Sequence, residues 1–466
     1  MSLPSRLPAI LQAVMQGQPR ALADSHYPRW HSAPVTGLMN DPNGFVEFAG
    51  RYHLFYQWNP LACDHKFKCW AHWSSADLLH WQHEPIALMP DEEYDRNGCY
   101  SGSALDNDGT LTLCYTGNVK FADGSRTAWQ CLATENADGT FSKLGPVLPL
   151  PEGYTGHVRD PKVWQHEGLW YMVLGAQDLQ KRGKVLLFSS ADLHQWKSKG
   201  EIAGCGINGL HNAGYMWECP DLFPLGDQHV LICCPQGIAQ EKERYLNTYP
   251  AVWMAGAFDY ASGTFKHHEL HELDAGFEFY APQTTQTSDG RRLLVGWMGV
   301  PDGEEMLQPT RANGWIHQMT CLRELELIDG RLYQRPLREL TALRGKAHGW
   351  QETSLPLAPM EIILETAHHD VLNIDFGGAL TLERDVNGIR LSRRSLASDE
   401  MHYRYWRGAI RSLRIFIDQS SVEIFINGGE GVMSSRYFPD YPARLVFTGK
   451  TPSVFCCWPL RTCMVE

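Results

Sequence analysis

Three acidic residues lie in local sequences that could present a carboxylate for catalysis. Asp41 lies in "GLMNDPNG", Asp160 in "VRDPKVW" and Glu218 in "MWECPDLF". An Asp before Pro most often serves a turn or a cap, so Asp41 and Asp160 are weak signals when taken singly. Glu218 is more telling, because an apolar environment strips hydration from a carboxylate and favours its protonated form.

Together the three carboxylates suit cleavage of a glycosidic bond. We expect burial and repulsion from Asp41 and Asp160 to raise the pKa of Glu218, so that it holds a proton while a partner stays ionised. In glycoside hydrolysis the acid protonates the leaving oxygen, and the ionised partner attacks the anomeric carbon. The sequence contains no P-loop, GxGxxG motif or Ser-His-Asp elbow that would favour another chemistry.

Internal repetition indicates how such distant residues could meet. The sequence "SSADLLHW" at 74–81 returns as "SSADLHQW" at 189–196. A unit made of a short polar dipeptide, a turn and an apolar strand begins near residues 42, 101, 161, 220 and 282. These starts are about 60 residues apart, a spacing that suits one four-stranded blade with its connections. Five such units predict a five-bladed β-propeller, with a large β-sandwich as the alternative.

The propeller prediction brings the unit starts together in space. The innermost strand of each blade borders the central channel, so the five starts are expected at one end of that channel. The residues that would converge there are Asp41, Tyr100, Ser101, Arg159, Asp160, Glu218 and Tyr280.

The whole chain is predicted to be all-β apart from a short N-terminal helix. We expect a helical segment over 1–25, the propeller over 26–335, a linker over 336–350 and a β-sandwich over 351–466. In the sandwich, apolar and polar residues alternate, and turns at 418–420 and 427–429 indicate hairpins.

The N-terminal segment favours an amphipathic helix rather than a signal peptide. Its apolar residues at helical spacing are Leu7, Ile10, Leu11, Val14 and Met15. Gln12 interrupts the apolar run, and no small-residue cleavage site follows. No stretch of the sequence is long enough to span a bilayer, so we expect a cytoplasmic protein without a membrane partner.

Composition favours a protein that handles small solutes. The net charge is −12, and no Lys/Arg cluster is long enough to bind nucleic acid. The 16 Trp suit a β-rich core or stacking on sugar rings. The 13 Cys are scattered and odd in number, which fits free thiols in a reducing compartment. Residues 63–70, "CDHKFKCW", lack the spacing of a zinc site, so no metal is expected.

Eight motifs in order resemble glycoside hydrolase family 32. They are "LMNDPNG", "FYQWNP", "YSGSA", "RDPKVW", "WECPDLF", "LDAGFEFYAPQT", "LVGWMG" and "SSVEIFINGGEGVMSSR", and they span about residues 26–440. The resemblance implies a five-bladed propeller with a C-terminal sandwich, and retaining cleavage of β-fructofuranosides without a cofactor. Within the family the likeness is greatest to bacterial invertases that act on sucrose 6-phosphate, so sucrose 6-phosphate or sucrose is the implied small-molecule substrate.

The resemblance also implies roles for individual residues. Asp41 would be the nucleophile, Glu218 the general acid/base, and Asp160 the residue that holds fructose hydroxyls and stabilises the transition state. The positions that match the family's substrate pocket are Asn40, Gln57, Trp58, Tyr100, Ser101, Arg159, Tyr280 and Trp297.

Two positions depart from the family pattern. Leu38 stands where the family usually has Trp, which could alter affinity without removing a catalytic group. His65 and Lys66 stand where relatives often have Trp-Gly. A cation gained beside the leaving-group subsite would favour a phosphorylated glucose, so Lys66 is a candidate phosphate ligand. The alternative is a solvated surface lysine.

Two rival functions stay open at this point. A fructan or fructooligosaccharide hydrolase on the same scaffold would need an open pocket. A non-catalytic sugar-binding propeller is expected to lack at least one of the three carboxylates, and all three are present. The sandwich is expected to brace the propeller, and its exposed hairpins are compatible with a homodimer.

Overall fold

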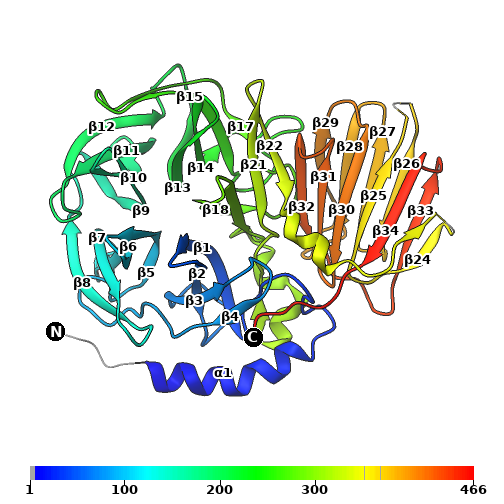
Figure 1. Ribbon diagram of the computed structural model, residues 1–466, viewed down its shortest axis with the longest axis horizontal. Helices are drawn as coiled ribbons and strands as arrows, with labels where there is room; N and C mark the ends of the chain where they lie inside the picture. The colour runs from blue at the N-terminus through cyan, green and yellow to red at the C-terminus, as the bar shows by residue number, and fades with distance from the viewer. Residues whose placement is uncertain (1–5, 351, 368) are drawn as a thin grey trace.

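The computed structural model describes residues 6–350, 352–367 and 369–466. A ring of five β-sheets lies beside a two-layer sandwich, with helix α1 (Leu7–Leu22) below the ring (Figure 1). The predicted fold class, a five-bladed propeller followed by a β-sandwich, is therefore confirmed. The predicted domain limits stay predictions, and the parts of them that fall on 1–5, 351 and 368 lie outside the described residues.

In each blade the strand that comes first in the chain lies toward the centre of the ring and pairs antiparallel with the strand that follows it. These innermost strands are β1 (Gly37–Phe48), β5 (Cys99–Asn107), β9 (Tyr154–His166), β13 (Ala213–Leu225) and β18 (Tyr280–Gln286). Neighbouring innermost strands contact one another, β1 with β5 and β18, β5 with β9, and β13 with β9 and β18. Every predicted unit start lies in one of these five strands, so the repeat in the sequence does mark the blades.

The outer strands complete the five sheets and carry the apolar residues between blades. They are β2 (Arg51–Asn59), β3 (Cys69–Ser75), β4 (Trp81–His83), β6 (Thr110–Lys120), β7 (Arg126–Glu135), β8 (Phe141–Leu148), β10 (Leu169–Asp178), β11 (Gly183–Ser190), β12 (Lys197–Gly204), β14 (Gln228–Ile238), β15 (Val252–Asp259), β16 (Thr264–His267), β17 (His271–Glu272), β19 (Arg292–Trp297), β21 (Arg323–Ile328) and β22 (Arg331–Pro336). Central strands such as β11 are buried along their whole length, as expected for strands covered on both faces.

The ring is closed by a short strand from the far end of the propeller sequence. Strand β20 (Trp315–Ile316) pairs in parallel with β1, at Gly37 and Leu38. The chain reaches β20 through two 3₁₀ helices, η1 (Glu305–Leu307) and η2 (Pro309–Asn313). The first blade is therefore built from both ends of the propeller sequence.

The sandwich consists of two six-stranded sheets, reached through η3 (Arg338–Leu343). One sheet has the order β23 (His348–Gly349), β34 (Val454–Pro459), β25 (Met360–Glu365), β30 (Ser412–Asp418), β31 (Ser421–Ile426), β32 (Gly431–Arg436). The other has the order β24 (Ser354–Pro356), β33 (Arg444–Gly449), β26 (Leu372–Phe376), β27 (Leu380–Asp385), β28 (Gly388–Arg394), β29 (Met401–Arg407). The hairpins predicted from the turns after 418 and 427 join β30, β31 and β32 and are confirmed.

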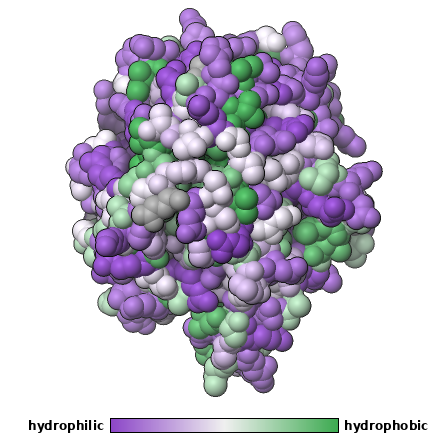
Figure 2. Space-filling model, turned by 90° about the vertical axis from the view of Figure 1, so that its right-hand side faces the viewer, coloured by the Kyte–Doolittle hydropathy of each residue, from purple (hydrophilic) through white to green (hydrophobic). Residues whose placement is uncertain are grey.

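The outer face of the sandwich is mainly hydrophilic, with hydrophobic side chains in separated patches (Figure 2). The predicted N-terminal helix is confirmed as α1, but its buried residues differ from the expected face. Ile10, Gly17 and Ala21 are buried, whereas Leu11 and Met15 are exposed. Within the described part of the chain, no helix has both the length and the hydropathy needed to cross a membrane.

A buried ionic cluster joins the propeller to the sandwich. His31 donates from Nδ1 to Asp418 and from Nε2 to Glu423, each at 2.9 Å, and all three side chains are fully buried. Burial by itself lowers the pKa of His31, but the hydrogen bonds and charges of the two carboxylates raise it above its usual value. Arg323 reaches Glu423 at 2.8 Å, so the cluster extends into the last blade.

We expect His31→Gln to lower the melting temperature, and to do so more at pH 5.5 than at pH 8.5. A raised folded-state pKa makes the contribution of His31 complete below its unfolded pKa of about 6.5, and that contribution is lost as pH rises through the folded-state value. Thermal melts across this pH range measure the effect, with the exposed His80→Gln as the control. A difference that does not change with pH would contradict a charged His31.

Candidate active site

Each of the five innermost strands has a β-bulge at the position of a predicted site residue. The pairing register shifts between Met39 and Pro42, Tyr100 and Gly102, Arg159 and Lys162, Glu218 and Asp221, and Tyr280 and Gln283. A bulge adds a residue that has no partner, bends the strand and turns a side chain. Asp160, Cys219 and Ala281 at these bulges have positive φ angles of 67°, 50° and 47°. The irregular backbone thus lies where the predicted site residues are.

Asp41 is held through both of its carboxylate oxygens. Asn40 donates an amide N–H to Oδ1 at 2.9 Å, and Ser101 donates its hydroxyl to Oδ2 at 2.6 Å. Asn40 comes from the same bulge of β1, and Ser101 comes from the bulge of the next blade. The orientation of Asp41 is therefore set by two neighbouring blades.

Cys219 places Asp160 next to the other carboxylates. Its backbone N–H donates to Asp160 Oδ2 at 3.0 Å, and its Sγ lies 3.7 Å from Asp160 Oδ2 and 3.9 Å from Asp41 Oδ2. Two carboxylates thus contact one sulfur atom. Cys219 has a positive φ and its N–H points to Asp160. Glu218, the preceding residue, lies at the same bulge.

Glu218 accepts hydrogen bonds from three side chains. Arg159 donates to Oε1 from Nε at 3.0 Å and from Nη2 at 2.6 Å. Tyr280 and Gln236 donate to Oε2 at 2.6 Å and 2.8 Å. The contacts come from three different blades, so the carboxylate lies at their common centre.

The expected raised pKa of Glu218 is wrong for this structure. Burial raises the pKa, but the charge of Arg159 and the hydrogen bond from Tyr280 lower it below the usual value. Asp160 shows the opposite shift: burial raises its pKa to about 7, against the effect of Arg159 and with repulsion from Glu218 and Asp41. Desolvation and repulsion act as expected from the sequence, but they raise the pKa of Asp160 instead of Glu218, because Arg159 contacts Glu218.

Among the remaining predicted pocket residues, Trp58 differs from Gln57, Tyr100 and Trp297 in its surroundings. Gln57 donates to the backbone of Cys99 at 2.8 Å, and the Tyr100 ring faces Arg126 at 5.8 Å. Trp297 lies edge-on to Tyr280 at 6.3 Å, and its buried indole N–H has no hydrogen-bond partner among the described residues. Trp58 instead is only 4% exposed in the hydrophobic core and donates its N–H to the Thr36 carbonyl. The structure therefore offers no free face of Trp58 for a sugar.

Lys66 and Lys68 are placed very differently. The Lys66 side chain is 89% exposed, and its Nζ lies 3.7 Å from Asp64. Lys68, which the sequence argument did not select, is buried and donates to Asn40 Oδ1. The only hint in the sequence was a lysine directly before the apolar strand that begins at Cys69. Gln236 was also missed, because its partner Glu218 lies on the neighbouring strand β13 and this pairing cannot be read from the sequence.

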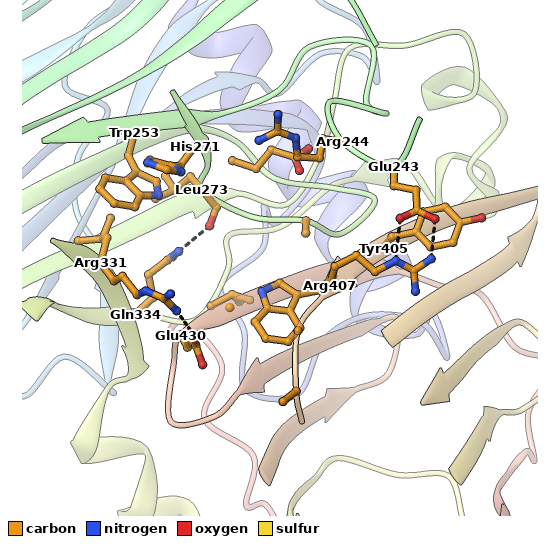
Figure 3. Close-up of a pocket in the computed structure, with 18 of the residues that line it drawn as sticks. Glu243, Arg244, Trp253, His271, Leu273, Arg331, Gln334, Tyr405, Arg407 and Glu430 are labelled. Atoms are coloured by element: carbon orange, nitrogen blue, oxygen red, sulfur yellow. Dashed lines mark hydrogen bonds and ion pairs between the residues drawn. The ribbon is translucent and has the colours of Figure 1, made fainter. Parts of the chain in front are cut away.

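A separate cavity of about 870 Å³ lies between the propeller and the sandwich (Figure 3). None of the three carboxylates is among the described residues that line this cavity. Ion pairs cross it from one part to the other, Glu243 to Arg407 at 2.6 Å and Arg331 to Glu430 at 2.5 Å. Over the described residues, no group of three His, Cys, Asp or Glu side chains is arranged to hold a metal ion.

The propeller, the three carboxylates at its centre and the attached β-sandwich fit a glycoside hydrolase. The family model for the glycosyl hydrolases family 32 N-terminal domain matches residues 31–336, and that for the C-terminal part matches 379–453. The chain belongs to glycosyl hydrolase family 32.

Individual relatives agree with this assignment. The sucrose-6-phosphate hydrolase of Salmonella typhimurium is 85% identical over the full length of both chains. The structure of sucrose-6-phosphate hydrolase from Lactobacillus gasseri aligns with a TM-score of 0.88 at 30% identity, covering 97% of this chain and 96% of that one. A mutant of the Bombyx mori β-fructofuranosidase in complex with sucrose aligns with a TM-score of 0.85 at 31% identity, covering 98% and 99%.

Proposed function

We propose that the protein hydrolyses sucrose 6-phosphate to fructose and glucose 6-phosphate, and that it also accepts sucrose. The observation that carries the proposal is the convergence of Asp41, Asp160 and Glu218 from the bulges of β1, β9 and β13. The substrate class rests on the names of the 85% identical relative and of the Lactobacillus gasseri structure. The sucrose complex of the Bombyx mori enzyme supports binding of the unphosphorylated sugar.

In the first step Asp41 attacks the anomeric carbon of fructose and Glu218 gives a proton to the leaving glucosyl oxygen. The bond between fructose and that oxygen breaks, and a fructosyl ester of Asp41 forms. In the second step Glu218, now ionised, takes a proton from water, which attacks the same carbon and releases Asp41. Asp160 holds fructose hydroxyls during both steps.

Arg159 influences which of the carboxylates is protonated. Arg159 lowers the pKa of Glu218, whereas burial raises the pKa of Asp160 to about 7, so Asp160 is protonated in part of the molecules near neutral pH. To act as the general acid in the first step, Glu218 has to take up a proton, which the charge of Arg159 opposes. All 13 cysteines are free in the structure, which supports action in the reducing cytoplasm. A homodimer stays a prediction.

Fructose release from sucrose 6-phosphate, sucrose and a fructooligosaccharide tests the proposal directly. We expect the highest kcat/KM for sucrose 6-phosphate, and NMR of the first product should show β-fructofuranose, because two displacements retain the configuration. Preference for the fructooligosaccharide would favour the fructan hydrolase. Sugar binding without cleavage would favour the non-catalytic propeller.

The exposed position of Lys66 leads to a specific prediction about the phosphate group. We expect Lys66→Ala to leave the KM for sucrose 6-phosphate unchanged within about twofold, because a solvated side chain near Asp64 contributes little binding energy. Steady-state kinetics on sucrose and sucrose 6-phosphate measure this. A rise in KM for the phosphorylated substrate alone would restore the phosphate role that the sequence suggested.

A further inference from the structure

A chain of side-chain hydrogen bonds leads from a propeller loop to Asp41. His65 Nε2 lies 2.8 Å from Glu305 Oε1, and His65 Nδ1 lies 2.7 Å from Lys68 Nζ. Lys68 Nζ also donates to Asn40 Oδ1, and the Asn40 amide nitrogen donates to Asp41 Oδ1 at 2.9 Å. Three side chains, those of His65, Lys68 and Asn40, thus connect Glu305 with the proposed nucleophile.

The chemistry of Lys68 fixes the direction of the bonds around it. An ammonium group can only donate, so its partner on Asn40 has to be the carbonyl oxygen. The amide NH₂ of Asn40 is then turned toward Asp41. If the amide were turned by half a rotation, its oxygen would face the carboxylate and repel it.

The other end of the chain is equally well defined. Because Lys68 donates to His65 Nδ1, the proton of neutral His65 is on Nε2, which donates to Glu305. His317 Nε2 donates to the same carboxylate at 2.7 Å, and its buried Nδ1 has no partner in the described part of the chain, as expected for a neutral ring. Glu305 therefore anchors the tautomer of His65.

The buried charge of Lys68 calls for a functional explanation. Lys68 is 6% exposed, and the partners of its Nζ within the described part of the chain are the amide of Asn40 and the imidazole of His65. Burial lowers its pKa to about 8, while the charges of Asp41, Glu305 and Asp64 oppose that shift. A buried ammonium that contacts only neutral groups is costly and is seldom kept for stability alone.

We propose that Lys68 is a positioning residue that orients the amide of Asn40 and thereby aims Asp41 at the anomeric carbon. The proposal rests on the proposed function, in which Asp41 is the nucleophile. Glu305 and His65 hold Lys68 in place. The sandwich supports the loop that carries Glu305, since Ser395 donates its hydroxyl to the neighbouring Glu304.

Lys68→Met tests this role, because methionine keeps an unbranched side chain that is one atom shorter and removes the donor. We expect kcat to fall roughly 10- to 100-fold on both sucrose and sucrose 6-phosphate, since a small misplacement of a reacting group has effects of that size. The KM ratio of the two substrates should stay within about twofold, and the melting temperature should not fall, because replacing a buried charge by an apolar side chain is often neutral or stabilising. The exposed Lys199→Met is the matched control.

A double-mutant cycle separates positioning from other roles. If Lys68 acts through Asn40, then Lys68→Met should cost less than about twofold in an Asn40→Ala background, where the orientation no longer matters. Additive losses would overturn the proposal, as would an increase in KM confined to sucrose 6-phosphate, which would make Lys68 a phosphate ligand. Full activity of Lys68→Met with an inactive Asp41→Asn would remove the positioning role alone. Full activity of Asp41→Asn would instead remove the proposed function.

Discussion

Asp41→Asn is expected to lower kcat/KM for sucrose 6-phosphate by roughly four orders of magnitude or more, as loss of a catalytic nucleophile does elsewhere. An amide has nearly the shape of the carboxylate but cannot form the fructosyl ester. Ser101 and Asn40 surround the position closely, at 2.6 Å and 2.9 Å, so the substitution should leave the fold intact. Fructose release at substrate concentrations well below KM measures the loss.

The matched control for this experiment is Asp138→Asn. Asp138 lies in an exposed turn after β7, so the same change of charge there should leave kcat/KM unaltered. Equal melting temperatures of the two variants would exclude unfolding as the cause. Activity of Asp41→Asn within tenfold of the wild type would contradict its role as nucleophile.

Glu218→Gln is expected to have the second largest effect, and the size of that effect should depend on the leaving group. With sucrose 6-phosphate we expect kcat to fall roughly 10²- to 10⁴-fold, the usual contribution of a general acid. With β-fructofuranosyl fluoride, whose leaving group needs no proton, formation of the fructosyl enzyme should be nearly normal. Rapid-mixing measurement of the fluoride released in the first turnover distinguishes the two steps.

The contacts of Glu218 also supply a control for this variant. Tyr280→Phe removes one donor to Glu218 but keeps the carboxylate, so its loss on sucrose 6-phosphate should be smaller than that of Glu218→Gln. Equal losses in first-turnover rate on the fluoride and on sucrose 6-phosphate would show that Glu218 is not a proton donor.

The fold was largely predictable from the sequence, because the signal lies in a repeat and in strand alternation. A unit of about 60 residues marks each blade, and its start marks the innermost strand. The buried face of α1 was predicted less well, since Leu11 and Met15 have the right spacing but point to solvent. A helix of this kind is placed by its neighbours, and the sequence does not show which side they cover.

The candidate site was predictable only in part, because its electrostatics depend on pairings between blades. Asp41, Asp160 and Glu218 could be selected one by one, each from its own motif. The contact of Arg159 with Glu218 links residues 59 positions apart and reverses the expected order of the pKa values. Lys66 and Lys68 lie two residues apart in a loop, where no periodicity tells which of them turns inward.

The buried cluster at His31 constrains the order in which the molecule can be completed during synthesis. Asp418 accepts the backbone N–H groups of Arg29, Trp30 and His31, at 2.8, 3.1 and 3.1 Å. The segment that leads into the first blade therefore cannot reach its final place until almost the whole sandwich has left the ribosome. At roughly 5–20 residues per second, synthesis of the residues between His31 and Asp418 takes on the order of 20 to 80 seconds. The nascent first blade lacks its contacts with the sandwich for that time. During that interval it depends on the other blades, or on chaperones, to protect its apolar edges.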